Sequence, residues 1–417
     1  MTNRVVILGG GTGGTLTANR LRRRFPESEL AITVVDQDDR HVYQPGLLFV
    51  PFGLSHVEDI VRSRSRQLRR GVDFVRAPVD RVDIQARRVD LEGAPSLDYD
   101  VLVVASGAVL VPEETAGLTG DGWMRKVFTF YTPEGAAALE SALARFDGGR
   151  LVVNVVDMPI KCPVAPLEFC FLADAYFQER GIRSQVEITY VTPLDGAFTK
   201  PVASGQLGGM LAARGVELVT EFNTGEVDGG AGRLVSYDGR EVPFDLAVVV
   251  PLHAGAPYVG RSPGLGDELD FVPADEHTLQ STAAPEIFVI GDAANVPASK
   301  AGSVTHFEGE TVVENIARYL HGQPLVGGFD GHANCFIETG HDKAVLIDFN
   351  YDHDPVPGHY PARVGLPLLK ESHLNHLGKL LFESLYWHGL LPGRDIPGVG
   401  APMPTSGRHE PVAITKE

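Results

Sequence analysis

The hydrophobic and polar residues of this chain alternate in blocks that predict short buried strands followed by helices. The apolar residues 5–8 lead into a glycine turn and a helical stretch, and the apolar segment 31–36 follows as a second strand. Further apolar runs, at 149–157 and 184–193, flank the helical segment 165–181. Strands that alternate with helices in this way predict an α/β fold with parallel sheets.

The first turn carries a nucleotide-binding pattern. Its sequence, "GGGTGG", places Gly9, Gly11 and Gly14 at G-x-G-x-x-G spacing between the first strand and the helix. Glycine lets the backbone turn sharply and lets a pyrophosphate approach the amide groups at the helix N-terminus, where the helix dipole favours negative charge. Asp36, about twenty residues further on at the end of the second strand, is placed to accept hydrogen bonds from ribose hydroxyls. These residues predict a dinucleotide-binding domain.

Two later segments resemble parts of an FAD domain. The stretch 97–108, "LDYDVLVVASGA", is a buried strand that runs into a turn of small residues, and 285–297, "PEIFVIGDAANVP", is a strand that ends in Gly-Asp. In this order and spacing the segments resemble the FAD domain of the two-dinucleotide-binding flavoproteins. The resemblance implies that Asp292 holds a ribityl hydroxyl of FAD; the alternative is that Asp292 caps a helix. The other expected cofactor-binding residues are Ala105, Gly107, Gly291, Lys300 and Gly302.

An inserted region, 112–240, has the strand, helix and strand of a second nucleotide-binding unit. The turn after its first strand is "DMPIKCP", 157–163. Proline fixes the backbone dihedral φ and removes an amide donor, so this turn cannot cradle a pyrophosphate as a glycine turn does. We therefore expect a second Rossmann-like domain that has lost its NAD site.

The C-terminal part has a different character. Two strands are expected within 331–352, followed by a helix across 372–387. The predicted fold class is α/β, with two Rossmann-like domains of the disulfide-reductase type and a C-terminal α+β region that faces a membrane or an interface. The expected domains are 1–111 and 241–325 for FAD binding, 112–240 for the second Rossmann-like domain and 326–417 for the C-terminal region.

Composition narrows the function. Acidic residues outnumber basic ones, 54 against 36, and the net charge of −18 repels phosphate backbones, which argues against nucleic-acid binding. Three cysteines are too few for a secreted disulfide framework, and the N-terminus enters a strand at once, so we expect no signal peptide and synthesis in the cytoplasm. No apolar stretch approaches the roughly 20 residues that cross a bilayer. The C-terminal histidines lack metal-ligand spacing, so no metal is expected.

The three cysteines differ in their setting. Cys162 lies in the loop after a strand, beside Lys161 and just before a helix start; a cation and a helix N-terminus both stabilise a thiolate. Cys162 is therefore a candidate nucleophile. Cys170 lies within an apolar helical run and is expected to be a small buried hydrophobic residue. Cys335 lies far away in the sequence, in a C-terminal strand, and its own context does not decide between a structural and a chemical role.

Several of these motifs together resemble the sulfide:quinone oxidoreductase family. The most specific are "YQPG" and "KCPVAPLE", and "VIGDAANVPASKAG" and "NCF" also match. The resemblance implies bound FAD, oxidation of sulfide to persulfide or polysulfide sulfur at a cysteine pair, and transfer of the electrons through FAD to a membrane quinone. Carried over by motif, the pair is Cys162 and Cys335; which of the two faces the flavin stays open. Residues 123–131 lack the cysteine that many bacterial members carry there, so we expect non-covalent FAD.

Four further residues have expected roles in such a site. Glu168, a turn or so beyond Cys162, is a proton shuttle or, alternatively, a first-turn carboxylate that complements the helix dipole. Lys300 would bring positive charge to the flavin, or else lie solvated in its loop. Phe382 and Phe336 are the expected contacts of the quinone ring.

The C-terminal helix predicts contact with a membrane. Its leucines share one face of a helical projection: Leu374, Leu377, Leu381 and Leu385. The opposite face is polar: His376, Lys379 and Glu383. Tyr386 and Trp387 suit a membrane interface. A helix of this kind lies in the surface of a bilayer, so we expect peripheral attachment to the inner (cytoplasmic) membrane; the alternative is a helix that packs on the core or on a second copy in a homo-oligomer.

Three alternative functions share part of these features. A type II NADH:quinone oxidoreductase shares the fold, FAD and the acceptor, but the proline turn weighs against NADH binding. A flavocytochrome-type sulfide dehydrogenase normally works outside the cytoplasm, and no export signal is expected here. A non-catalytic redox-sensing flavoprotein would use the cysteine pair without turnover.

Overall fold

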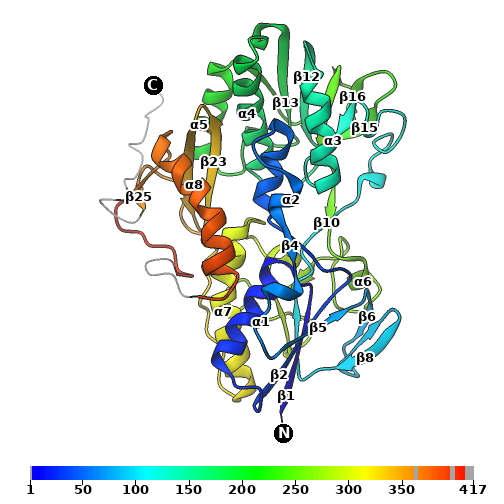
Figure 1. The fold of residues 1–417 in the computed structure, drawn as a ribbon, viewed down its shortest axis with the longest axis vertical. Coiled ribbons are helices and arrows are strands. Elements are labelled where there is room, and N and C mark those ends of the chain that lie inside the picture. The colour runs from blue at the N-terminus through cyan, green and yellow to red at the C-terminus, as the bar shows by residue number, and fades with distance from the viewer. Residues whose placement is uncertain (1, 361–364, 395–399, 409–417) are drawn as a thin grey trace.

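The structure is a computed structural model that describes residues 2–360, 365–394 and 400–408. The chain forms two α/β units, one above the other in Figure 1, and a C-terminal part that packs against them. The predicted α/β fold class with two Rossmann-like units is confirmed. Among the described residues, no helix is long and apolar enough to cross a membrane.

The first unit is built on a parallel five-stranded sheet with the order β21-β9-β1-β2-β5. Its strands are β1 (Asn3–Leu8), β2 (Leu30–Asp36), β5 (Val72–Arg76), β9 (Val101–Val104) and β21 (Ile287–Val289). Two helices pack together beside this sheet, α1 (Thr12–Arg24) and α7 (Gly302–Leu320). Val101–Val104 is buried throughout, as a strand covered on both faces requires.

The second unit holds another parallel sheet, with the order β11-β18-β12-β13-β14. Its strands are β11 (Val127–Phe128), β12 (Gly149–Val155), β13 (Val186–Val191), β14 (Val216–Val219) and β18 (Leu246–Val250). Its helices are α3 (Pro133–Ala144), α4 (Ala165–Glu179) and α5 (Pro201–Ala213). The expected domain boundary at residue 240 is too early, because β18 pairs with β12 and therefore belongs to this second sheet.

The C-terminal part is a four-stranded sheet and one long helix. The sheet has the order β23-β24-β26-β25, with strands β23 (Ala333–Gly340), β24 (Lys343–Phe349), β25 (Gly358–Tyr360) and β26 (Leu366–Leu368). The helix α8 (His373–Leu385) packs on β24 and β23 and continues into a π-helical turn, Tyr386–Leu390. On its other side β23 packs so closely on α4 that a Cβ at Gly340 would lie 2.5 Å from Ala175. This contact joins the C-terminal part to the second unit.

Shorter elements complete the chain. The remaining strands are β3 (Arg40–Val42), β4 (Val61–Ser63), β6 (Val79–Asp83), β7 (Arg88–Leu91), β8 (Ala94–Asp98), β10 (Val109–Leu110), β15 (Thr224–Asp228), β16 (Arg233–Ser236), β17 (Glu241–Pro243), β19 (His253–Ala254), β20 (Val272–Pro273) and β22 (Ala294–Asn295). Two single-turn helices are α2 (Val57–Ile60) and α6 (Pro257–Gly260).

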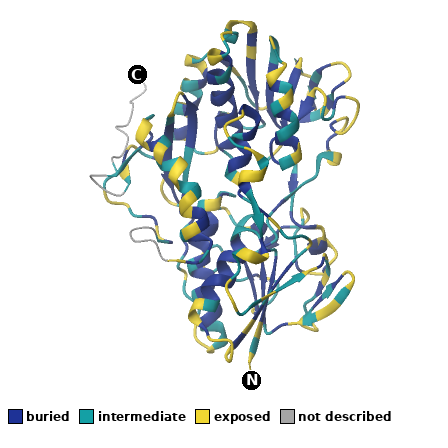
Figure 2. Cartoon of the chain, viewed as in Figure 1, coloured by how far each residue is buried: buried dark blue, intermediate teal, exposed yellow. Residues whose placement is uncertain are grey.

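Helix α8 turns its apolar face outward. The exposed leucines are Leu374, Leu377, Leu380, Leu381 and Leu385, of which Leu381 is 69% exposed. Figure 2 shows this helix as a largely exposed element on one side of the molecule. Tyr386 and Trp387 lie elsewhere than expected: both are buried, and the Tyr386 hydroxyl lies 2.6 Å from His41 Nε2. They anchor the helix end to the first unit and are not available to a membrane interface.

Candidate functional site

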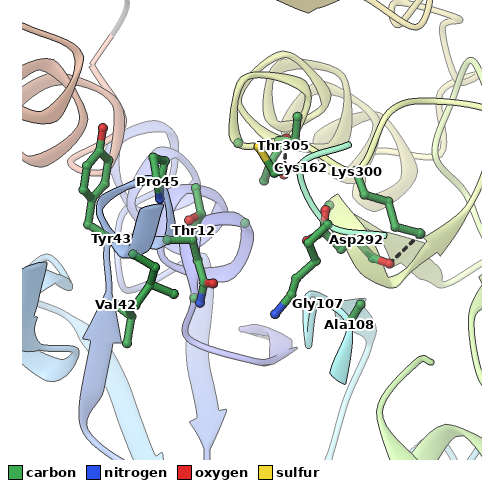
Figure 3. Close-up of a pocket in the computed structure, with 18 of the residues that line it drawn as sticks. Thr12, Val42, Tyr43, Pro45, Gly107, Ala108, Cys162, Asp292, Lys300 and Thr305 are labelled. Carbon is green, nitrogen blue, oxygen red and sulfur yellow. Dashed lines mark hydrogen bonds between the residues drawn. The ribbon is translucent and has the colours of Figure 1, made fainter. Parts of the chain in front are cut away.

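A cavity of about 400 Å³ opens where the first unit, the second unit and the C-terminal part meet. In Figure 3, Thr12, Val42 and Tyr43 lie on one side of it, with Cys162, Asp292 and Lys300 opposite. Most of the residues expected to bind a cofactor or to react line its wall: Gly9, Gly11, Asp36, Ala105, Gly107, Cys162, Glu168, Gly291, Asp292, Lys300, Gly302, Cys335, Phe336 and Phe382. The structure therefore gathers segments from all parts of the chain at one place.

The glycine turn forms one end of this cavity, and two of its glycines leave no room for a side chain. Gly9 has a φ of +100°, and a Cβ there would lie 2.4 Å from the carbonyl oxygen of Ala105. A Cβ on Gly14, behind the turn, would lie 1.8 Å from the carbonyl oxygen of Gly9. The strand, the turn and the N-terminus of α1 thus leave the backbone open to a diphosphate, which fits the pyrophosphate of FAD.

Asp36 ends β2 beside this turn. Its carboxylate accepts a hydrogen bond from the Gly10 amide (2.7 Å) and forms an ion pair with Arg64. Arg64 also lies 3.4 Å from Asp38 and is almost buried. Arg64 is a residue that sequence reasoning missed, because it belongs to a short loop without a recognisable motif. Together these groups form a polar end of the cavity suited to the ribose of a nucleotide.

Asp292 lies just beyond the carboxyl end of β21, inside the single-turn 3-10 helix Gly291–Ala293, whose N-cap is Ile290. Helix α7 begins at Gly302 with Ala301 as its N-cap, so the alternative that Asp292 caps a helix is wrong. Burial raises the pKa of Asp292, which the cations of Lys300 and Lys161 oppose. The side chain lines the cavity and is free to meet a hydroxyl-bearing ligand there.

Lys300 points its ammonium at the backbone. Its Nζ donates hydrogen bonds to the carbonyl oxygens of Asp292 (2.7 Å) and Ala294 (3.0 Å), and lies 4.0 Å from the ring centroid of Phe271. Burial lowers the pKa of this lysine, although Asp292 acts in the opposite direction. The alternative of a solvated loop lysine is wrong, because these contacts tie the side chain down and hold the 292–300 loop in shape (Figure 3).

Cys162 sits in the turn between β12 and α4 in a left-handed backbone conformation, with a φ of +48°. Its amide donates to the carbonyl oxygen of Lys300 (2.6 Å), and its own carbonyl accepts from the Ala165 amide (2.9 Å). These bonds fix the turn against the 292–300 loop of the first unit. Cys335 reaches the same cavity from β23, where it lies opposite Ile347. Both thiols are free and half-buried.

The protonation of the two thiols differs from expectation. Burial raises the pKa of Cys162 to about 12, and Glu168 adds to this, while Lys379 and the Ala165 amide oppose it. Burial also raises the pKa of Cys335, to which the neighbouring Cys162 and Glu168 contribute. The cation that opposes the rise in the pKa of Cys162 is Lys379, from a distant part of the chain. Both shifts favour the thiol over the thiolate, which is opposite to the effect expected of a cation and a helix N-terminus.

Cys170 takes no part in the cavity. It is fully buried within α4, and burial raises the pKa of its thiol. The prediction that it is a small buried hydrophobic residue is confirmed.

Glu168 and Lys379 form a buried ion pair at the floor of the cavity. The side chain of Glu168 is 3% exposed and that of Lys379 is 10% exposed. Burial raises the pKa of Glu168 in spite of Lys379. Burial lowers the pKa of Lys379, but Glu168 and Glu338 more than offset this effect and the pKa lies above its ordinary value. Sequence reasoning placed Lys379 on the polar face of its helix without a role.

Comparisons with known proteins agree with this geometry. A family model described as "Pyridine nucleotide-disulphide oxidoreductase" matches residues 3–155. The fold and the cavity define a flavoprotein enzyme of this oxidoreductase class. A mitochondrial sulfide:quinone oxidoreductase of Dictyostelium discoideum is 27% identical over 94% of this chain and 86% of its own length. The chain is thus similar over nearly its whole length to proteins named sulfide:quinone oxidoreductase.

Two further comparisons cover nearly the whole chain. The mitochondrial sulfide:quinone oxidoreductase of Mus musculus is 26% identical over 93% of this chain and 86% of its own length. Among solved structures, the sulfide:quinone oxidoreductase of the hyperthermophilic bacterium Aquifex aeolicus has the same fold, with a TM-score of 0.79 and 20% identity over 94% of this chain and 92% of that one.

Proposed function

We propose that this protein oxidises sulfide at Cys162 and Cys335 and passes the electrons to a quinone. The observation that carries the proposal is that two cysteines from distant segments line one cavity, whose other end is the glycine turn. The cavity thus joins a place for sulfur chemistry to a place for a dinucleotide. The likeness to relatives named sulfide:quinone oxidoreductase favours the same reaction.

FAD fits this cavity, and its residues divide into those that hold the cofactor and those that react. The glycine turn with Gly9 and Gly11, and the carboxylates of Asp36 and Asp292, would hold FAD non-covalently. When bound, FAD supplies a two-electron acceptor that can pass the pair on to a quinone. The chain itself supplies the backbone amides, the carboxylates and the exclusion of water around the thiols.

The sulfur step needs only the two cysteines. In their oxidised form they are joined as a disulfide, and HS⁻ attacks one sulfur, forms a new S–S bond and breaks the old one. One cysteine then carries a persulfide and the other is a thiolate. Lys379 is the cation that opposes the rise in the pKa of Cys162, so it favours the thiolate at the moment when the disulfide opens.

The quinone would enter beside α8. Phe336 and Phe382 both line the cavity near this helix, and the Phe336 ring lies so close to Gly378 that a Cβ there would come within 2.9 Å of it. The outward leucines of α8 give the protein an apolar surface next to this entrance. We assign this surface to peripheral contact with the cytoplasmic membrane, from which a quinone can reach the cavity without crossing water.

The proposed reaction predicts a two-step spectral change. Added anaerobically to the FAD-loaded protein, sulfide should bleach the flavin absorbance, and decyl-ubiquinone should then restore it. NADH should leave the spectrum unchanged, because the 157–163 turn has prolines where a pyridine nucleotide needs glycine. A flavin that responds to NADH and not to sulfide would instead establish a type II NADH:quinone oxidoreductase. A flavin that sulfide bleaches but no quinone restores would also contradict the proposal.

If the exposed leucines of α8 contact the membrane, replacing two of them with glutamate should weaken membrane binding. Glutamate at Leu377 and Leu381 together should reduce co-sedimentation with vesicles of phosphatidylcholine and phosphatidylglycerol by about tenfold or more, since burying one leucine contributes roughly 1.5–3 kcal/mol. Leu269→Glu is the matched control: Leu269 is 53% exposed but lies far along the chain from α8. Flavin content would show that the variants are folded. If the double variant bound vesicles as well as the wild type, the leucine face of α8 would not be the surface that contacts the membrane.

A further inference from the structure

A line of ionisable side chains connects the cysteine cavity with the protein surface. It consists of Glu168 on α4, Glu338 on β23, Lys379 and His376 on α8, and Asp342 in the turn between β23 and β24. We propose that this line is a proton relay that supplies the quinone site. The inference rests on the proposed function and adds residues and a direction of proton flow to it.

The inner half of the relay is buried at the floor of the cavity. Glu168 forms the ion pair with Lys379, and its Oε1 also accepts the backbone N–H of Glu338 at 2.7 Å. The Lys379 ammonium donates a further hydrogen bond to the carbonyl oxygen of Phe336 at 3.1 Å. Glu168 and Lys379 line the cavity together with both reactive cysteines. A proton held on this pair is therefore at the site where it is needed.

The outer half leads away from the cavity along the inward face of α8. His376 Nδ1 lies 3.0 Å from both carboxylate oxygens of Glu338, whose side chain is 2% exposed. On its other side, His376 Nε2 lies 3.7 Å from a carboxylate oxygen of Asp342, which is 86% exposed. A histidine with a carboxylate at each ring nitrogen can take up a proton at one nitrogen and release one at the other. The path thus ends in solvent.

The two halves meet where Glu168 accepts the Glu338 amide and pairs with Lys379, whose ammonium also feels the charge of the Glu338 carboxylate. The two carboxylates of Glu168 and Glu338 both act on its ammonium and together keep its pKa above the ordinary value. Burial in turn raises the pKa of Glu338, while Lys379 and His376 oppose this rise. The raised pKa values bring both carboxyls closer to neutral pH, where a carboxyl can take up a proton and release it again during turnover.

The stoichiometry of the reaction requires such a path. Oxidation of HS⁻ to protein-bound sulfane sulfur releases one proton and two electrons, whereas reduction of a quinone to a quinol takes up two of each. Each turnover therefore draws one proton from solvent, and the proton must reach a quinone that enters from an apolar surface. The relay approaches the cavity from the opposite face of α8 to the leucines, so the proton route and the membrane route lie on different sides of one helix.

The test compares His376→Ala with His373→Ala in stopped-flow experiments on the FAD-loaded protein. His373 is a matched control on the same helix, because its Nδ1 lies 2.7 Å from the backbone carbonyl of Asp342 and meets no carboxylate of the relay. In His376→Ala the rate of flavin reoxidation by decyl-ubiquinone, relative to the rate of reduction by sulfide, should fall by about tenfold or more. A solvent deuterium isotope effect should appear on the slowed step, and added imidazole should restore the rate. His373→Ala should match the wild type.

Glu338→Gln provides a second variant that keeps the shape of the side chain. It should slow the same step and delay proton uptake recorded with a pH-indicator dye, without rescue by imidazole. An unchanged ratio of the two rates in both variants would overturn the relay. A slowed step with neither an isotope effect nor imidazole rescue in His376→Ala would also overturn it, since it would show a structural role. If sulfide failed to bleach the wild-type flavin, the proposed function itself would fall, and the relay with it.

Discussion

Replacing either Cys162 or Cys335 with serine is expected to lower the rate of flavin reduction by sulfide by about a thousandfold or more. A serine hydroxyl neither forms a disulfide nor accepts a sulfane sulfur, so the S–S bond that HS⁻ attacks is absent. Loss of a covalent nucleophile in other enzymes has effects of this size or larger. The measurement is stopped-flow bleaching of the flavin under anaerobic sulfide.

Cys170→Ala is the matched control for both serine variants. Cys170 is the remaining cysteine of the chain, and it is fully buried in α4 and does not line the cavity. We expect this variant to reduce its flavin with sulfide at the wild-type rate. If either serine variant kept the wild-type rate, the cysteine pair would not be the site of sulfide oxidation, whatever the position of the two residues in the cavity.

The features of the fold that the sequence predicts are those encoded locally. The glycine turn is recognisable because Gly9 and Gly14 have no room for a Cβ, so their spacing follows from the backbone alone. The buried strands read as unbroken apolar runs for a similar local reason. The membership of β18 in the second sheet was missed, because its five buried residues could pair equally well with a strand of either unit.

The features that the sequence does not predict depend on contacts between distant segments. The pairing of Cys162 with Cys335 came from the family resemblance and not from the spacing of the residues. The ion pair between Glu168 and Lys379 joins residues 211 positions apart. A helical projection shows that α8 has an apolar and a polar face, but it does not show which face is inside. In the structure the polar face of α8 packs inward and the leucines face outward. Lys379 therefore reaches the cavity.

The last described segment also differs from expectation. From its position at the end of the chain, 397–417 is predicted to be a mobile tail; 397–399 and 409–417 lie outside the described residues. Within 400–408, however, Ala401 and Met403 are buried, and Arg408 forms an ion pair with the buried carboxylate of Asp348. A buried partner for one arginine is a tertiary feature that position in the chain does not reveal.

Lys379→Met is expected to destabilise the protein by about 3–5 kcal/mol at neutral pH, because removal of one partner leaves a buried charge without compensation. Methionine keeps the length and the apolar stem of the side chain, so the loss of stability measures the effect of removing the positive charge. Without the lysine, the carboxylates of Glu168 and Glu338 face each other unshielded. Denaturant unfolding of the flavin-free protein would measure the change. Lys343→Met is the control, since Lys343 is 41% exposed and 3.9 Å from Glu371, and should change stability by no more than about 0.5 kcal/mol.

The pH dependence of this loss identifies its cause. Burial already raises the pKa of Glu168, and loss of the cation raises it further. A carboxyl whose pKa is higher in the folded than in the unfolded protein favours folding at low pH, and this contribution is lost as the pH rises through the folded-state pKa. The deficit of Lys379→Met relative to the wild type should therefore be small near about pH 5 and grow towards about pH 8. Adding Glu168→Gln should recover part of it, because glutamine carries no charge. A deficit that stayed constant across this range would indicate lost packing and would contradict a charged Glu168–Lys379 pair.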